Sequence, residues 1–344
     1  MGLARWGWNE HIGEAFAAAG LTGEAARVVS ESRGICRLAL ARGEGMARPK
    51  GSLTPRPVTG DWAVVDAAAG VITGLLPRRT RISRKKAGRG AEEQVLAANV
   101  DVVFLVTALD GDLNLRRLER YLMVAQESGA GPVVVLNKQD LCADPVARLR
   151  EVESVTGALA PVVMLSALEE ASVAELHRYV EPGQTAVLLG SSGVGKSTIV
   201  NRLLKRDQQA TEQVRAGDRR GRHTTAMREL FLLEAGWLLM DTPGLRELEP
   251  WASPQAVAAA FPEIAELAAR CRFRDCRHQG EPGCAVAQAL GQGSLETARF
   301  ESFRKLEGEL ARLERLQDTR AALEQKRQWR NIHRAMRKTP DKRA

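Results

Sequence analysis

Short apolar runs recur through the middle of the chain, and each ends in a polar or glycine-rich segment. Four of these runs have the length of a buried strand: Pro132–Leu136, Pro161–Leu165, Thr185–Leu189 and Leu238–Met240. The segment Thr198–Leu204 predicts a helix between two of them. Strands that alternate with helices predict a doubly wound α/β domain, which we assign to residues 92–253.

The pattern is different in the first part of the chain. An alanine-rich stretch within residues 1–34 predicts a helix. Turn residues then separate three short strands: Ile35–Leu40, Val58–Val65 and Val71–Leu75. Gly43–Thr54 is expected to be a polar, basic loop. Short strands with a long basic loop are typical of an OB-type β-barrel that binds RNA, which we expect within residues 1–91.

The strand Thr185–Leu189 runs into a glycine-rich loop of the form G-x-x-x-x-G-K-S. The loop and the first residue after it are Gly190, Ser191, Ser192, Gly193, Val194, Gly195, Lys196, Ser197 and Thr198. In such a loop, backbone N–H groups surround the phosphates of a nucleotide. Lys196 is expected to contact the outer phosphates, and Ser197 is expected to bind Mg²⁺.

The strand Pro132–Leu136 is followed by a motif that suits a guanine base: Asn137, Lys138, Gln139 and Asp140. The Asp140 carboxylate can accept hydrogen bonds from the guanine N1–H and the exocyclic amine. Adenine lacks this pair of donors and would leave the carboxylate unpaired, which argues against an ATPase or a P-loop kinase. Another strand is followed by three residues expected to contact guanine through backbone N–H groups: Ser166, Ala167 and Leu168.

The last buried run leads to Asp241, on the metal side of the site, and to Gly244, which is expected to sense the γ-phosphate. Thr224 and Thr225 lie in the polar segment before it, and we favour Thr225 as a Mg²⁺ ligand with Ser197 and Asp241. In ordinary GTPases the phosphate loop precedes the guanine motif. Here the guanine motif comes first, so the order predicts a circularly permuted P-loop GTPase domain.

The residue after Gly244 is Leu245, where many GTPases carry a glutamine that orients the attacking water. Leucine cannot hydrogen-bond water, so we expect slow intrinsic hydrolysis of GTP. His223 lies in the switch segment and is our candidate to position the water; the alternative is a solvent-exposed switch histidine. Arg222 either stabilises developing charge or contacts RNA.

The last part of the chain becomes helical after Pro254 and carries a C-x4-C-x-H-x5-C motif. Its residues are Cys271, Cys276, His278 and Cys284. Three thiolates and one imidazole complete a tetrahedral Zn²⁺ site with no position for water, so we expect one structural zinc per chain; free thiols beside an incidental histidine are the alternative. The isolated Cys36 and Cys142 are expected to be inert.

Further apolar residues follow the motif at helical spacing and predict the core-facing stripe of a helix: Phe300, Phe303, Leu306, Leu310, Leu313 and Leu316. Residues 254–344 are therefore expected to form a helical zinc-binding domain with a basic tail.

The net charge of +8 is concentrated in two segments. Residues 320–344 hold nine Lys and Arg against Glu324 and Asp341, and Pro77–Ala91 holds seven Lys and Arg and no acid. Such segments favour a large polyanion as partner, with solvated basic stretches as the alternative. No apolar run has the length of a membrane span, and the N-terminus does not read as a secretory signal, so we expect a cytoplasmic protein without a membrane partner.

The permuted order, the switch Gly221–Thr225, the Gly7–Glu10 start and the zinc motif resemble the RsgA (YjeQ) family over nearly the whole chain. The resemblance implies an OB-fold, contact with rRNA, and GTP hydrolysis stimulated by the small ribosomal subunit late in its assembly. It implies GTP, GDP and this subunit as partners of an expected monomer. A non-catalytic RNA-binding module that uses nucleotide only as a structural ligand is the rival hypothesis.

Overall fold

The structure is a computed structural model and describes residues 2–85, 93–111, 113–205, 228–241, 254–308 and 311. Contacts within the chain define two compact units. The first combines Met1–Arg84 with Val95–Trp251, and the second combines Lys85–Gln94 with Ala252–Ala344. None of the helices in the described ranges is long and apolar enough to cross a bilayer.

Five strands near the N-terminus close into a small barrel: β1 (Glu24–Ser32), β2 (Ile35–Leu40), β3 (Gly43–Pro49), β4 (Trp62–Asp66) and β5 (Val71–Leu75). Their order is β1-β2-β3-β5-β4, and pairing of β4 with β1 closes the barrel. Only the β3–β5 pair is parallel. The core is built around Val28, Leu38 and Ile72, each at most 1% exposed. The expected OB-type barrel is confirmed.

Three barrel strands differ from the sequence-based expectation, and one of them, β4, begins at Trp62, four residues after the start of the predicted strand Val58–Val65. The predicted helix is present as α1 (Glu10–Ala18), whereas β1 was not predicted; Val28 and Val29 are buried in this strand, which pairs with both β2 and β4. The predicted basic loop contains β3. Only Ala47 of its seven residues is buried, so main-chain pairing with β2, and not an apolar pattern, makes this segment a strand.

The N-terminal segment covers the outer face of β4. It contains the 3-10 helix η1 (Leu3–Trp6) and α1, whose N-cap Asn9 accepts a hydrogen bond from the Ile12 backbone N–H at 3.1 Å. Trp8 packs edge-to-face on Trp62, with ring centroids 5.2 Å apart. A second apolar cluster therefore lies outside the barrel core.

A six-stranded sheet forms the rest of the first unit: β8 (Val102–Ala108), β9 (Gly131–Asn137), β10 (Val162–Met164), β11 (Thr185–Leu189), β12 (Glu229–Leu232) and β13 (Leu238–Asp241). The strand order is β10-β9-β8-β11-β13-β12, and only β12 runs antiparallel to its sheet neighbour β13. The chain moves outward from β8 to β10 and then returns to β11 on the other side of β8. The loop after β11 thus lies at the topological switch point, where doubly wound sheets bind ligands.

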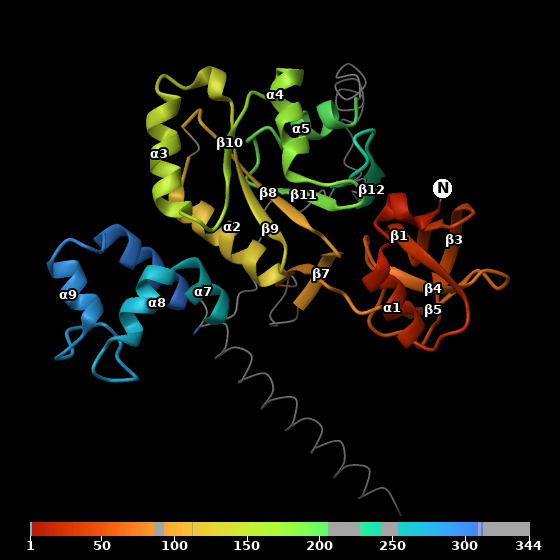
Figure 1. The fold of residues 1–344 in the computed structure, drawn as a ribbon, viewed down its shortest axis with the longest axis horizontal. Helices are drawn as coiled ribbons and strands as arrows, with labels where there is room; N and C mark the ends of the chain where they lie inside the picture. Colours follow the sequence, from red (N-terminus) through yellow and green to blue (C-terminus); the bar gives the residue numbers. More distant parts are fainter. Residues whose placement is uncertain are drawn as a thin grey trace, which may run out of the picture. The chain divides into compact units, whose positions relative to one another are not determined.

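Helices cover both faces of this sheet (Figure 1). Helices α2 (Leu115–Ser128) and α3 (Pro145–Thr156) share one core with Leu105 of β8. The other core contains Phe104 of β8 and is formed with α4 (Glu170–Ala174), the 3-10 helix η3 (Glu175–Tyr179) and α5 (Lys196–Leu203). Neighbouring residues of β8 thus point to opposite faces, as expected for a strand buried on both sides.

Hydrogen bonds join the barrel to the sheet. Strand β1 pairs with β12, where Ser30 lies opposite Glu229, and Arg37 of β2 forms an ion pair with the Glu229 carboxylate. Strands β6 (Arg81–Lys85) and β7 (Glu93–Ala98) pair as a separate two-stranded sheet.

Part of the basic segment Pro77–Ala91 stabilises the fold. Arg78 donates from Nε to Oδ1 of the fully buried Asp61 at 2.7 Å, and Arg79 forms an ion pair with Asp101. These two guanidinium groups are therefore already engaged within the protein.

In the second unit, the described residues from Pro254 onward form four helical segments: α7 (Pro254–Ala260), α8 (Pro262–Ala269), α9 (Ala285–Gly291) and residues 297–308. Phe300 and Leu306 are buried, and Phe303 packs edge-to-face on Phe261 with centroids 5.6 Å apart. These three positions confirm the predicted helix stripe. Its other members lie outside the described residues: Leu310, Leu313 and Leu316.

Candidate active site and metal centre

Two glycines shape the phosphate loop between β11 and α5. Gly190 has a φ of 154°, and a Cβ there would lie 2.2 Å from the Val106 carbonyl oxygen. Gly195 has a φ of 97°, and its Cβ would lie 2.1 Å from the Asn137 amide nitrogen. Neither position accommodates a side chain, so the loop backbone can approach β8 and the guanine motif closely.

The other loop residues divide between anchoring and exposed positions. Val194 is 1% exposed and packs into the sheet core. The Lys196 ammonium donates to the carbonyl oxygens of Gly190, at 2.7 Å, and of Ser191. Three loop residues face solvent: Ser192, Gly193 and Ser197; Thr198 is half-buried in α5. Lys196 thus lies across the mouth of the loop, where outer phosphates would bind.

Asn137, at the end of β9, connects the three loops of the site. Its amide nitrogen donates to the Val194 carbonyl oxygen at 2.7 Å, and its amide oxygen accepts from the Ala167 backbone N–H at 2.9 Å. The side chain is 1% exposed, so both hydrogen bonds are shielded from water. One residue therefore links the guanine motif, the phosphate loop and the segment after β10.

The remaining guanine-motif residues occupy a tight turn after β9. Lys138 has a left-handed backbone with a φ of 62°, and its ammonium forms an ion pair with Asp110. The Gln139 backbone N–H donates to the Leu165 carbonyl oxygen at 3.3 Å. Asp140 follows in the short helix η2 (Gln139–Leu141) and is exposed. Its carboxylate is thus accessible to a base at this sheet edge.

Hydrogen bonds hold the segment after β10 in place, and one of them comes from Arg202, a residue that the motifs did not indicate. Ser166 is buried and its backbone N–H donates to Ser172 Oγ at 3.0 Å, whereas Leu168 is 65% exposed. Arg202 of α5 donates from Nη2 to the Leu168 carbonyl oxygen at 2.9 Å. This hydrogen bond connects the helix of the phosphate loop to the segment after β10 that is predicted to contact guanine. Asp110, the partner of Lys138, was likewise not predicted.

Hard oxygen donors suited to Mg²⁺ lie on two neighbouring elements. Ser197 is in the first turn of α5, and Asp241 ends β13, which pairs with β11. The other predicted residues of this side lie outside the described residues: His223, Thr225 and Gly244. Their assignments remain predictions.

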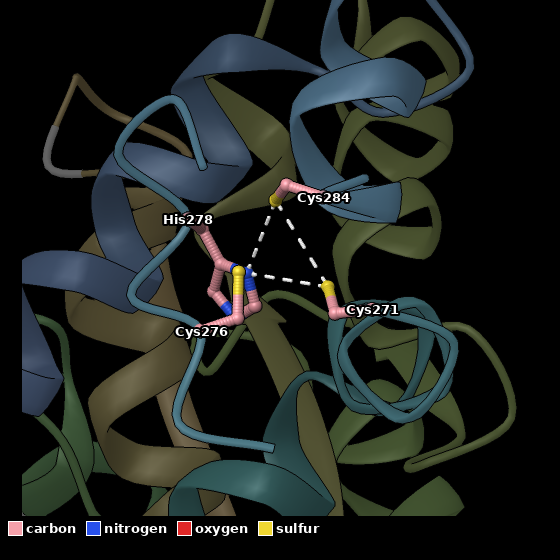
Figure 2. A group of neighbouring side chains, drawn as sticks. All are labelled: Cys271, Cys276, His278 and Cys284. Atoms are coloured by element: carbon pink, nitrogen blue, oxygen red, sulfur yellow. Dashed lines mark hydrogen bonds between the residues drawn. The ribbon is translucent and has the colours of Figure 1, made fainter. Parts of the chain in front are cut away.

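The four predicted zinc ligands converge on one point (Figure 2). Cys271 Sγ lies 3.9 Å from Cys284 Sγ and 3.6 Å from His278 Nδ1, and Nδ1 lies 3.4 Å from Cys284 Sγ. Tetrahedral ligands at the usual Zn–S and Zn–N lengths would be separated by about 3.8 Å for two sulfurs and about 3.6 Å for sulfur and nitrogen. The donor set and its spacing therefore fit zinc.

Local backbone structure positions these ligands. His278 has a φ of 58°, and Cys284 is the N-cap of α9, where its sulfur accepts from the Ala287 backbone N–H at 3.3 Å. Desolvation raises the pKa of the Cys271 thiol, but hydrogen bonds, chiefly from the Val286 and Ala285 backbone, outweigh it and bring the pKa below its usual value. The thiolate that a metal requires is thereby favoured.

This geometry defines a circularly permuted P-loop GTPase domain accompanied by a small barrel and a cysteine–histidine cluster. The sequence model of the RsgA GTPase family matches residues 75–251. Across 98% of this chain and 97% of the relative, the sequence is 46% identical to the small ribosomal subunit biogenesis GTPase RsgA of Opitutus terrae. The chain belongs to the RsgA GTPase family and is a GTP hydrolase.

Solved structures agree with the fold. YjeQ from Thermotoga maritima aligns with a TM-score of 0.64 at 26% identity, covering 84% of this chain and 98% of that one. YloQ, described as a circularly permuted GTPase, aligns with a TM-score of 0.61 at 21% identity, covering 87% and 96%. The permutation expected from motif order is thus present in the fold.

Proposed function

We propose that this GTPase binds the small ribosomal subunit and its rRNA and assists late maturation of that subunit. The main support for this proposal is that the sheet of the guanine-nucleotide site is hydrogen-bonded to the OB-type barrel, because β12 pairs with β1. The barrel presents exposed basic side chains on β3 and the adjoining loops: Arg42, Arg48, Lys50 and Arg56. Such charges suit phosphate contacts with RNA. The name of the Opitutus relative supports the ribosomal partner.

In this proposal, different residues at the sheet edge bind the base, the phosphates and the metal ion of GTP. Asp140 reads the guanine edge, and the backbone of Ser166–Leu168 contacts the base from the other side. The loop Gly190–Thr198 surrounds the phosphates, with Lys196 on the outer ones. Ser197, Thr225 and Asp241 would hold Mg²⁺, which neutralises charge on the phosphates when bound.

Hydrolysis is proposed to be slow until the subunit binds. Leu245 offers no hydrogen bond to the attacking water, and His223 is the proposed group that positions it. Gly244 would sense the γ-phosphate. A zinc ion held by Cys271, Cys276, His278 and Cys284 has a structural role in this account, because all four coordination positions belong to the protein.

We assign these functions to three modules. Residues 1–91 bind RNA, residues 92–253 hydrolyse GTP, and residues 254–344 bind zinc and make further RNA contacts through the basic tail. We propose that the protein acts as a cytoplasmic monomer without a membrane partner.

Multiple-turnover phosphate release with and without purified small subunits tests this function, with free rRNA as a control. We expect the subunit to raise kcat at least about tenfold, since positioning of a general base typically contributes more than that. Unchanged turnover would overturn the proposed function and favour a module that uses nucleotide only as a structural ligand.

Two variants separate the role of the His223 side chain from the role of the positive charge in residues 320–344. His223→Ala should retain GTP and subunit binding but lose most of the stimulation. Deletion of residues 320–344 should leave basal hydrolysis unchanged while weakening subunit binding and flattening its salt dependence. Full stimulation of His223→Ala would show that another group orients the water, and unchanged affinity of the deletion at low and high salt would exclude the tail as an RNA contact.

A further inference from the structure

A lateral row of side chains connects the barrel to the metal side of the nucleotide site. Ser30 of β1 lies opposite Arg37 of β2 on one side and opposite Glu229 of β12 on the other. Glu229 in turn lies opposite Asp241 of β13. Residues directly opposite each other on antiparallel strands point to the same face of a sheet. The four side chains therefore form one row across β2, β1, β12 and β13.

The row lies on the face of the sheet that α5 covers. Leu239 is two residues before Asp241 on β13 and so points to the same face. It belongs to the apolar core that contains Ile199 of α5. Ser197, the other described residue proposed to bind Mg²⁺, is in the first turn of this helix. The row thus extends from the barrel to the face on which Mg²⁺ is proposed to bind.

Two side-chain contacts anchor the start of β12 to the barrel. The Arg37 guanidinium donates a hydrogen bond to the Glu229 carboxylate and forms an ion pair with it. Thr59 is buried, and its Oγ1 donates to the Arg228 carbonyl oxygen at 3.2 Å. The barrel therefore fixes the point at which the chain enters β12.

Strand β1 belongs to the barrel core and to the sheet core. Val28 packs in the barrel core, whereas the next residue, Val29, packs in the sheet core. The register with β2 shifts between Val28 and Ser30, where β1 passes from one core to the other. One continuously packed framework therefore holds all four side chains of the row.

The charges along the row give Arg37 a specific role. Glu229 and Asp241 are both carboxylates, and like charges directly opposite each other on two strands are destabilising. The ion pair with Arg37 draws the Glu229 carboxylate toward the barrel and compensates its charge. The side chains of Arg37 and Glu229 are 35% and 27% exposed, so solvent screens this pair only in part. Without Arg37, the Glu229 carboxylate could turn toward Asp241 and toward the cation that Asp241 is proposed to bind.

We propose, on the basis of the Mg²⁺ role proposed above for Asp241, that Arg37 is a positioning residue for GTP hydrolysis. By pairing with Glu229, it keeps that carboxylate away from Asp241 and from the bound cation. The barrel then contributes to hydrolysis itself, in addition to its proposed contact with RNA. Because Arg37 acts through Glu229, its effect should disappear when residue 229 is neutral.

Phosphate release from the full chain at saturating GTP and Mg²⁺, without ribosomal subunits, tests the proposal. Arg37→Met should lower kcat about fivefold, the upper size of one cross-strand charge interaction. KM for GTP and the affinity for GDP should change less than about twofold, because the guanine motif and the phosphate loop follow β9 and β11, outside the row. Arg37→Lys keeps the cation and should retain most of the turnover. In a Glu229→Gln background, Arg37→Met should leave kcat unchanged.

A second measurement requires neither metal nor turnover. The urea midpoint of the nucleotide-free chain in Mg²⁺-free buffer should fall in Arg37→Met. It should fall less in an Asp241→Asn background, because the opposed carboxylate is then absent. An ion pair that only stabilises the fold would lower the midpoint equally in both backgrounds. Glu24→Gln is the control, since it removes an exposed ion pair with Arg42 at the other end of β1 and should not change kcat.

A kcat of Arg37→Met equal to that of the unmodified chain would overturn the proposal, and so would an equal loss of the urea midpoint in both backgrounds. Asp241→Asn separates this proposal from the proposed function. Loss of turnover in Asp241→Asn with full turnover in Arg37→Met would overturn only the role of Arg37. Full turnover in Asp241→Asn would overturn the Mg²⁺ assignment of Asp241 together with the role of Arg37.

Discussion

The nucleotide site and the cysteine–histidine cluster use opposite routes to bring functional groups together. The nucleotide site collects loops after β9, β10 and β11, and one buried side chain, Asn137, ties them by hydrogen bonds. The cluster draws its four ligands from fourteen consecutive residues, Cys271–Cys284, and needs only a turn and a helix N-terminus. The first site depends on the topology of a whole sheet, whereas the second depends on local structure. Damage to one should therefore leave the other intact.

The largest expected effect is loss of metal from the cluster. Cys276→Ser should abolish stoichiometric zinc and loosen the C-terminal region, because the binding free energy of a structural zinc is also folding free energy. Metal analysis and hydrogen exchange of residues 254–308 provide the measurement. GTP affinity should remain within about twofold, and Cys142→Ser, outside the cluster, should retain zinc. A metal-free protein with a normally protected C-terminal region would contradict this role.

Lys196→Ala is expected to have the largest effect on the nucleotide side. Removing the ammonium from the mouth of the phosphate loop should lower GTP turnover at least about a hundredfold, as the loss of a preorganised charge donor typically does. Zinc content should be unchanged. Turnover equal to that of the unmodified chain would refute the assigned role of Lys196.

Asn137→Ala tests whether one side chain holds the nucleotide loops together. The change leaves the Val194 carbonyl and the Ala167 N–H without their partner, which should reduce the free energy of unfolding by about 2–4 kcal/mol and weaken GTP binding. Urea unfolding and GTP titration measure these effects. Asn114→Ala is a matched control, since Asn114 caps α2 and should cost only about 1 kcal/mol without changing GTP affinity. Equal changes in unfolding free energy and in GTP affinity for the two variants would contradict the proposal that Asn137 holds the nucleotide loops together.

The smallest predicted effect belongs to Arg202. Arg202→Gln removes the hydrogen bond from Arg202 to the Leu168 carbonyl oxygen. Because this bond positions the segment Ser166–Leu168, its loss should lower GTP affinity about threefold to tenfold. Arg178→Gln removes an exposed ion pair with Glu175 and serves as the control. An unchanged GTP affinity in Arg202→Gln would show that the Arg202 hydrogen bond does not contribute to GTP binding and would leave Asn137 as the side chain that positions these loops.

Motif spacing was sufficient to predict that three cysteines and one histidine cluster and that the motif loops lie at one sheet edge, because both patterns are specific in sequence. Arg202 and Asp110 were not predictable in this way. Each meets its partner across tens of residues through a fold-dependent contact, and an isolated arginine or aspartate carries no signal of that contact.

The strands show the same division. Buried runs such as Thr185–Leu189 were correctly predicted because burial on both faces requires continuous apolar sequence. Strand β3 was missed because six of its residues are at least partly exposed and its strand character comes from pairing with β2. Strand β1 was not predicted, since the expected strands begin only at Ile35, and pairing with both β2 and β4 decides its conformation.

The central claim is that loops from a permuted chain assemble one guanine-specific site, and base discrimination tests it most directly. Calorimetric titration of GTP, ATP and XTP into the unmodified chain and into Asp140→Asn is the measurement. The unmodified chain should bind GTP at least about a hundredfold more tightly than ATP, and Asp140→Asn should shift the preference toward XTP, since the amide can donate to the xanthine carbonyl. Comparable affinities for GTP and ATP in the unmodified chain would contradict the account.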